Sequence, residues 1–127
     1  MKFDRSGIIV ISRNYVECVS FYKNIFELKE IFTKKEGDFG LTCFEFGESY
    51  LMIETDSDES DDAKSLSKTS VILRLHVADI DSALASLQNK NISTVFNKND
   101  WGSTIDVTDP DGNRINIRDE QSFVDQI

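Results

Sequence analysis

The pattern of apolar and polar positions changes from strand to helix and back within the first 54 residues. A continuous apolar run predicts a buried strand, and apolar residues at helical spacing predict a helix after it. Asn14, with Glu17 three residues later, predicts a capping box at the start of this helix. The predicted elements are a strand, a helix, a strand and a two-stranded hairpin, at residues 7–12, 14–26, 28–33, 41–46 and 50–54.

The same order of elements returns in the second half. Asp79 caps a second predicted helix, and residues 109–113 (DPDGN) predict the turn of a second hairpin. The strands predicted here lie at residues 71–77, 91–96, 103–107 and 114–118. A common offset of 65 residues relates the halves, as in the pairs Gly7 and Ile72, Asn14 and Asp79, Tyr22 and Leu87, and Gly47 and Gly112. The chain is therefore predicted to be an internal duplication of a β-α-β-β-β unit.

An acidic, Ser-rich stretch separates the two halves. We interpret residues 56–70 as a solvated linker, because it is nearly free of apolar residues. The 127 residues suit one domain. Its predicted parts are module one, the acidic linker, module two and a C-terminal tail, at residues 1–55, 56–70, 71–119 and 120–127.

Composition narrows the classes of partner. The net charge of −9 argues against nucleic acid or anionic membrane as the main partner, since phosphates need neutralising Lys and Arg. No apolar run has the length of a secretory or membrane-spanning segment, so we expect a cytoplasmic protein with free thiols on its two cysteines. His76 is the only histidine, so the chain alone cannot supply a metal site built from several imidazoles.

Alternation within the predicted strands separates two faces. In the strand at 71–77, Leu73 and Leu75 share an apolar face, while Arg74 and His76 point the other way. The polar face is predicted to carry Arg74, His76, Arg114, Asn116 and Arg118. This pattern favours an α+β fold in which helices cover one face of a cupped mixed sheet and the other face lines a cavity. The alternative is that the polar face is simply solvated.

Three segments resemble a known family. Residues 19–28 (VSFYKNIFEL) are similar to its "FY..vLGl" signature, and residues 77–83 (VADIDSA) to its "V.Did.A" signature. Trp101-Gly102 followed by residues 109–117 (DPDGNRINI) is similar to "wG...f...DPdGN.iei". The chain thus resembles the vicinal oxygen chelate superfamily, the glyoxalase / bleomycin resistance / dioxygenase group. The resemblance implies two tandem βαβββ modules around a cupped site, and a homodimer.

The resemblance also locates the positions that hold a divalent ion in metal-dependent members. Carried onto this chain, they are Gly7, Leu51 or Met52, Ile72 and Asn116, and the 65-residue offset favours Leu51 over Met52. Glycine and isoleucine offer no side-chain ligand, and a neutral amide is a poor replacement for a glutamate. The resemblance therefore implies a chain with no metal and no cofactor.

The candidate ligand-binding residues are Trp101 at a loop-to-strand junction and, on the polar face, Arg74, His76, Arg114, Asn116 and Arg118. His76 is a candidate general base or a structural histidine. Trp101 could stack on a planar ligand or pack at a dimer edge. The arginines could bind an anionic group or pair with nearby acids.

These observations favour a metal-independent protein that sequesters a small molecule, closest to the bleomycin resistance branch. The alternatives are an enzyme of the superfamily (a lyase, epimerase or dioxygenase) with an atypical site, and a structural or regulatory dimer without a ligand. A binding protein is favoured over a metal-dependent enzyme because the implied chelate positions lack hard ligands.

Overall fold

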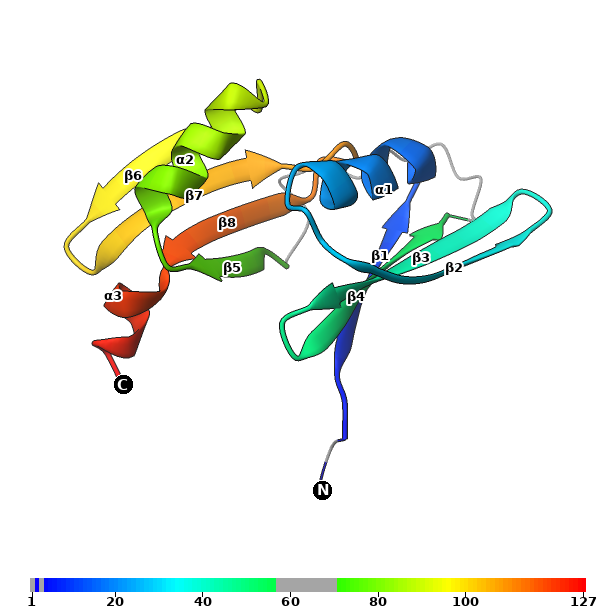
Figure 1. Cartoon of the computed structure of the whole chain (residues 1–127), viewed down its shortest axis with the longest axis horizontal. Coiled ribbons are helices and arrows are strands. Elements are labelled where there is room, and N and C mark those ends of the chain that lie inside the picture. The colour runs from blue at the N-terminus through cyan, green and yellow to red at the C-terminus, as the bar shows by residue number, and fades with distance from the viewer. Residues whose placement is uncertain (1, 3, 57–70) are drawn as a thin grey trace. The chain divides into compact units, whose positions relative to one another are not determined.

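The computed structural model describes residues 2, 4–56 and 71–127, and the chain divides into unit 1, Met1–Ala63, and unit 2, Lys64–Ile127. Each unit holds one four-stranded sheet (Figure 1). Most of the predicted linker at 56–70 lies outside the described residues. No helix in the described part of the chain is long and apolar enough to cross a membrane.

Unit 1 folds as a four-stranded mixed sheet with one helix. Its elements are β1 (Gly7–Ser12), α1 (Tyr15–Asn24), β2 (Glu30–Glu36), β3 (Phe39–Phe46) and β4 (Ser49–Thr55). The strand order is β1-β4-β3-β2, in which β1 runs parallel to β4 and the other neighbours are antiparallel. A strand that pairs in parallel needs a crossover, and α1 lies in the connection that leads away from β1.

Unit 2 repeats this arrangement. Its elements are β5 (Leu73–Val77), α2 (Ile80–Asn89), β6 (Val95–Asn99), β7 (Gly102–Thr108), β8 (Arg114–Asp119) and α3 (Glu120–Val124). The strand order is β5-β8-β7-β6, and β5 again runs parallel to β8. The predicted α+β fold with two tandem βαβββ modules is therefore confirmed.

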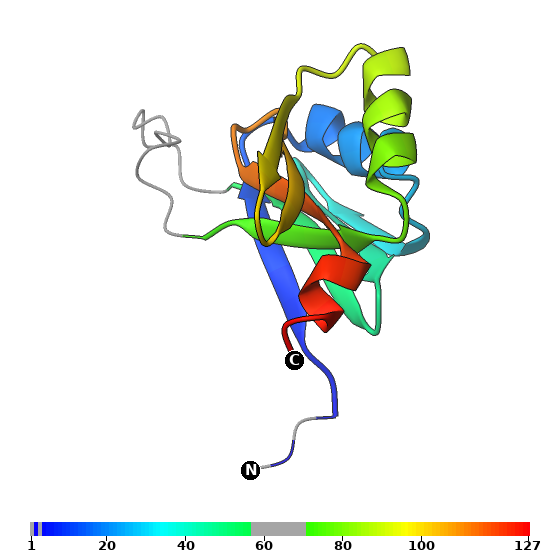
Figure 2. The ribbon, with the colours of Figure 1, turned by 90° about the vertical axis from the view of Figure 1, so that its left-hand side faces the viewer.

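Each helix covers one face of its own sheet. In unit 1, α1 packs against β4, where Leu51 and Ile53 are fully buried. In unit 2, α2 lies along the face of the sheet formed by β7 and β8, where Ile105 and Ile115 are buried (Figures 1 and 2). Burying about 150 Å² of aliphatic side chain contributes several kcal/mol, so these apolar faces hold each sheet against its helix.

Local details depart from the sequence predictions in three places. Asn14 makes no side-chain capping hydrogen bond, so the predicted capping box does not form, whereas the Asp79 carboxylate accepts a 3.1 Å bond from the Ser82 backbone N–H as predicted. The strand predicted at 91–96 begins only at Val95, because Asn91 adopts a left-handed conformation (φ 59°) that ends the helix. The predicted tail contains a helix, α3, which follows directly from β8 (Figure 2).

Candidate functional site

The face of each sheet that lies away from its helix is called here its open face. On unit 1 it is formed by Gly7, Ile9, Phe32, Cys43, Glu45, Tyr50 and Met52, and on unit 2 by Arg74, His76, Val95, Thr104, Asp106, Thr108, Arg114, Asn116 and Arg118. These assignments follow from the strand registers, because residues directly paired across strands point to the same side. The predicted separation of Leu73 and Leu75 from Arg74 and His76 agrees with the register of β5 and β8.

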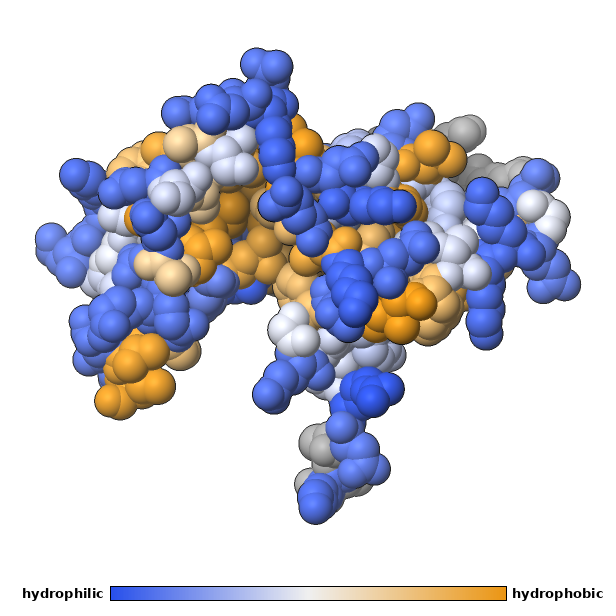
Figure 3. Space-filling view, in the orientation of Figure 1, coloured by the Kyte–Doolittle hydropathy of each residue, from blue (hydrophilic) through white to orange (hydrophobic). Residues whose placement is uncertain are grey.

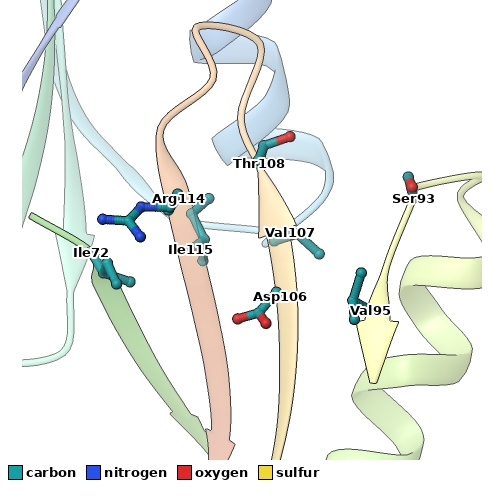
Figure 4. A pocket seen from close by; sticks show the side chains of 8 residues that line it. All are labelled: Ile72, Ser93, Val95, Asp106, Val107, Thr108, Arg114 and Ile115. Atoms are coloured by element: carbon teal, nitrogen blue, oxygen red, sulfur yellow. The ribbon is translucent and has the colours of Figure 1, made fainter. Parts of the chain in front are cut away.

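A pocket lies on the open face of unit 1, and another pocket on unit 2 is lined by residues from both faces of its sheet. The first pocket, of about 650 Å³, lies on unit 1, and its lining includes Phe32, Cys43, Glu45, Tyr50 and Met52. The second pocket, of about 510 Å³, lies on unit 2 and is shown in Figure 4. Its lining residues are Ile72, Ser93, Val95, Asp106, Val107, Thr108, Arg114 and Ile115. Volumes of this size suit small organic ligands.

The two pockets occupy equivalent places in the duplicated units. In unit 1, Cys43 pairs with Phe32 on one side and with Met52 on the other. In unit 2, Asp106 pairs in the same way with Val95 and with Asn116. The equivalent pairs are Phe32 and Val95, Cys43 and Asp106, Glu45 and Thr108, and Tyr50 and Arg114. The duplication therefore keeps the position of the pocket but changes its chemistry from sulfur and aromatic groups to a carboxylate and a guanidinium.

One of the predicted ligand-binding residues, Arg114, lines the second pocket, and Arg74 and Asn116 lie on the open face of the same sheet. Figure 4 shows Arg114 and Ile72 at one side of the pocket and Val95 at the other. Arg74 pairs in register with Asn116 and is exposed. Within the described part of the chain, Arg74 makes no hydrogen bond or ion pair, so its guanidinium is available to an anionic group.

Asn116 is held by a carboxylate on the neighbouring strand. Its Nδ2 donates a 2.5 Å hydrogen bond to Asp106 Oδ1, and Asn97 Nδ2 donates a 3.0 Å bond to Asp106 Oδ2. Asn116 Oδ1 is buried and has no hydrogen-bond partner among the described residues. Burying a carbonyl oxygen without a hydrogen-bond partner costs free energy. A hydrogen-bond donor that reaches Asn116 Oδ1 from outside the described residues therefore binds favourably.

Arg118 and Trp101 belong instead to a cluster held by α3. Arg118 is 6% exposed, and its guanidinium lies over the Trp101 ring at 4.7 Å and over the Phe123 ring at 5.5 Å. Its Nη2 donates to the Trp101 carbonyl oxygen at 3.1 Å and its Nε to Ser122 Oγ at 3.2 Å. This guanidinium is thus engaged inside unit 2, and a ligand-binding role for Arg118 stays a prediction.

His76 contacts the same helix. Its ring packs edge-on against Phe123 with centroids 4.9 Å apart, and its Nδ1 lies 3.5 Å from Glu120 Oε2. The apolar end of α3 and the residues after it remain exposed, at the lower left of Figure 3, through Phe123, Val124 and Ile127. Sequence reasoning missed this helix, for which the local start signals are Asp119 at the N-cap and the acidic Glu120 in the first turn.

The start of α3 should be sensitive to acid. Hydrogen bonds from the Ser122 backbone N–H and hydroxyl hold the pKa of the Asp119 carboxyl below its usual value. A carboxyl whose pKa is lowered by folding stabilises the folded state above its ordinary pKa of about 3.9, and this contribution is lost as the pH falls through the lowered value. Trp101 fluorescence, which reports the α3 cluster, is therefore expected to change as the pH falls below about 4. An Asp119→Asn variant with the same acid profile would contradict this assignment.

The residues at the metal positions do not fit a divalent ion. The register places Leu51 in the core of unit 1, fully buried, and Met52 on the open face, so Met52 replaces Leu51 as the equivalent of Asn116. A side chain at Gly7 would collide with the Tyr50 ring, and Ile72 has no donor atom. Within residues 2, 4–56 and 71–127, no three His, Cys, Asp or Glu side chains gather to hold a metal.

Comparisons with known proteins give the same fold. The family model of the Glyoxalase/Bleomycin resistance protein/Dioxygenase superfamily matches residues 7–117. No curated protein sequence matches the chain.

Among solved structures, a lactoylglutathione lyase from Agrobacterium tumefaciens is 16% identical, with a TM-score of 0.71 over 91% of this chain and 92% of that one. The fosfomycin resistance protein FosX from Listeria monocytogenes is 15% identical, with a TM-score of 0.74 over 93% and 94%. TnmS3, an antibiotic binding protein from Streptomyces sp. CB03234, is 17% identical, with a TM-score of 0.73 over 93% and 96%. The family match spans most of the sequence, and so the chain belongs to the Glyoxalase/Bleomycin resistance protein/Dioxygenase superfamily.

Proposed function

We propose that the chain binds a small organic molecule carrying an anionic group, without a metal ion, and sequesters it. The observation that carries this proposal is the chemistry of the four chelate-equivalent positions. Gly7 lies under the Tyr50 ring, and Met52, Ile72 and Asn116 offer a thioether, a hydrocarbon and a neutral amide. At these four positions there is no ligand set for lyase, epimerase or dioxygenase chemistry that relies on a hard ion to polarise substrate oxygens.

The open face of unit 2 supports binding of an anion. Arg114 lines the second pocket, and the exposed Arg74 side chain lies on the same face. Ile72 and Val95 add apolar surface to the lining, on which a flat or aliphatic portion of the ligand can rest. TnmS3, described as an antibiotic binding protein, has the same fold, which makes antibiotics a reasonable class to test. His76, Trp101 and Arg118 are proposed to support this face through the α3 cluster.

The test is calorimetry and thermal denaturation against aromatic carboxylates and antibiotics that carry a carboxylate or phosphate group, each measured once with EDTA and once with an added divalent ion. A ligand at 100 times its Kd is expected to raise the free energy of unfolding by about 2.7 kcal/mol. Arg74→Ala should weaken binding of an anionic ligand at least tenfold, whereas the exposed Lys98→Ala on β6 should leave it unchanged. Turnover of the ligand, or binding that requires a divalent ion, would favour the enzyme alternative and overturn the proposal, as would the absence of any stabilising compound.

From the resemblance we also propose that the protein is a cytoplasmic homodimer. Sedimentation equilibrium at micromolar concentration would give twice the 14.4 kDa chain mass, and a monomer would contradict the proposal.

A further inference from the structure

Two sulfur-bearing side chains face each other across the floor of the first pocket. Cys43 on β3 and Met52 on β4 are direct register partners, and both line the cavity of about 650 Å³ on the open face of unit 1. Directly opposed residues on antiparallel strands have Cβ atoms about 5 Å apart, which lets two side chains reach one atom between them. The methionine side chain has three rotatable bonds and can adjust its sulfur position.

The Cys43 thiol has no partner of its own in this part of the molecule. It is 3% exposed and not disulfide-bonded, and it makes no hydrogen bond within the described residues. Burial raises the pKa of this thiol, so it is neutral and weakly nucleophilic when nothing is bound. Cys18 differs, because it lies on α1, fully buried in the core of unit 1.

The two sulfur ligands select against hard ions. Phe32 and Tyr50 line the pocket beside them, and its charged lining residues are Arg5, Glu45 and Glu48. Thiolate and thioether ligands select soft ions such as Cu(I), whereas Mg²⁺, Ca²⁺ and Mn²⁺ require oxygen ligands. Monovalent ions of this class are satisfied by two sulfur ligands, so a site of this kind needs no third His, Asp or Glu.

We propose that Cys43 and Met52 form a binding site for a soft monovalent metal ion, with Cu(I) as the ion of this chemistry most relevant to a cell. Binding replaces the thiol proton, which passes to solvent, and joins the ion to Cys43 Sγ and Met52 Sδ without any change of oxidation state. The site includes Met52, which is one of the chelate-equivalent positions. Its ligands are sulfur atoms, whereas the resemblance implies oxygen or nitrogen ligands in the metal-dependent members of the family. It is independent of the anion-binding face proposed on unit 2.

The test is an anaerobic titration of the full chain with Cu(I) in competition with bicinchoninate, with bound copper measured by elemental analysis. We expect one Cu(I) per chain. Cys43→Ala should abolish copper retention, and the nearly volume-conserving Met52→Leu should weaken it at least tenfold. The matched control Cys18→Ala removes the other cysteine and should keep full stoichiometry. Copper bound equally by the wild type and Met52→Leu, or lost equally in Cys18→Ala, would overturn the proposal.

A second measurement does not depend on removing Cys43. In the Cys18→Ala protein the only thiol is Cys43, so its rate of alkylation by iodoacetamide reports that sulfur directly. One equivalent of Cu(I) should slow alkylation at least tenfold in this variant, and Met52→Leu in the same background should reduce the protection. Unchanged alkylation in the presence of Cu(I) would contradict the site even if copper adheres elsewhere. The organic-ligand screen has no bearing on either result, so failure of one proposal leaves the other measurable.

Discussion

Replacement of Asp109 by alanine is expected to lower the free energy of unfolding of unit 2 by about 3 kcal/mol. The Asp109 carboxylate is 5% exposed and accepts hydrogen bonds from the Asp111 and Asn113 backbone N–H groups, at 2.9 and 2.8 Å, and from Asn113 Nδ2 at 2.8 Å. Alanine would leave these donors without their acceptor in a partly buried turn, and hydrogen bonds to a charged group contribute about 1.5–3 kcal/mol each, not additively.

Urea denaturation followed by Trp101 fluorescence measures this loss, because the only tryptophan lies in unit 2. The matched control is Asp100→Ala, which removes the same charge from an exposed turn and should change stability by less than about 0.5 kcal/mol. Equal effects of the two substitutions would show that the loss comes from net charge and not from the hydrogen-bonded turn.

The role of the Asp109 turn explains why the family resemblance predicts the fold. The Asp109–Asn113 segment closes the β7–β8 hairpin through the Asp109 carboxylate, and Gly112 adopts a left-handed conformation within it (φ 84°). The residues that mark the family therefore fix backbone geometry, which any member needs whatever it binds. The ligand-determining positions are not constrained in this way, so the sequence predicts the fold and the faces of the strands better than the ligand.

A single offset between the two halves does not locate all of the positions equivalent to the metal ligands. The 65-residue offset holds for Gly7 and Ile72, but the register pairs give 63 for Cys43 and Asp106 and 64 for Met52 and Asn116. The offset rises from 63 to 64 because the hairpin from Thr108 to Arg114 is one residue longer than the equivalent hairpin from Glu45 to Tyr50. A shift of one residue moves a side chain to the other face of a strand, which is why the offset pointed to Leu51 in the core.

The helix α3 and its cluster escaped prediction for a different reason. Five residues carry too short a pattern for helical periodicity to show. Two of the contacts that hold the helix are long-range: Phe123 packs against His76 of β5, and Ser122 lies beside Gly102 at the start of β7. Three predicted site residues, His76, Trp101 and Arg118, are thus engaged by an element that local sequence did not reveal.

Gly102→Ala is expected to lower the free energy of unfolding by about 3 kcal/mol and to displace α3 from its position beside the start of β7. Gly102 has φ 140°, a conformation that side chains with a Cβ avoid, and an added Cβ would overlap Ser122 Oγ and lie 2.8 Å from Ser122 Cβ. Strained backbone and overpacking cost about 1–3 kcal/mol each, and here both act at one residue.

The matched control separates the two costs. Gly37 also has positive φ (59°), but a Cβ there meets nothing within 4 Å, so Gly37→Ala carries backbone strain alone and should cost about 1 kcal/mol. Because α3 holds Phe123 and Ser122 against Arg118, its displacement should also change Trp101 fluorescence under native conditions in Gly102→Ala and leave it unchanged in Gly37→Ala. If Gly102→Ala is no more destabilising than Gly37→Ala and leaves the fluorescence unchanged, the contact between β7 and α3 does not hold the cluster together, and His76, Trp101 and Arg118 must be positioned by the sheet alone.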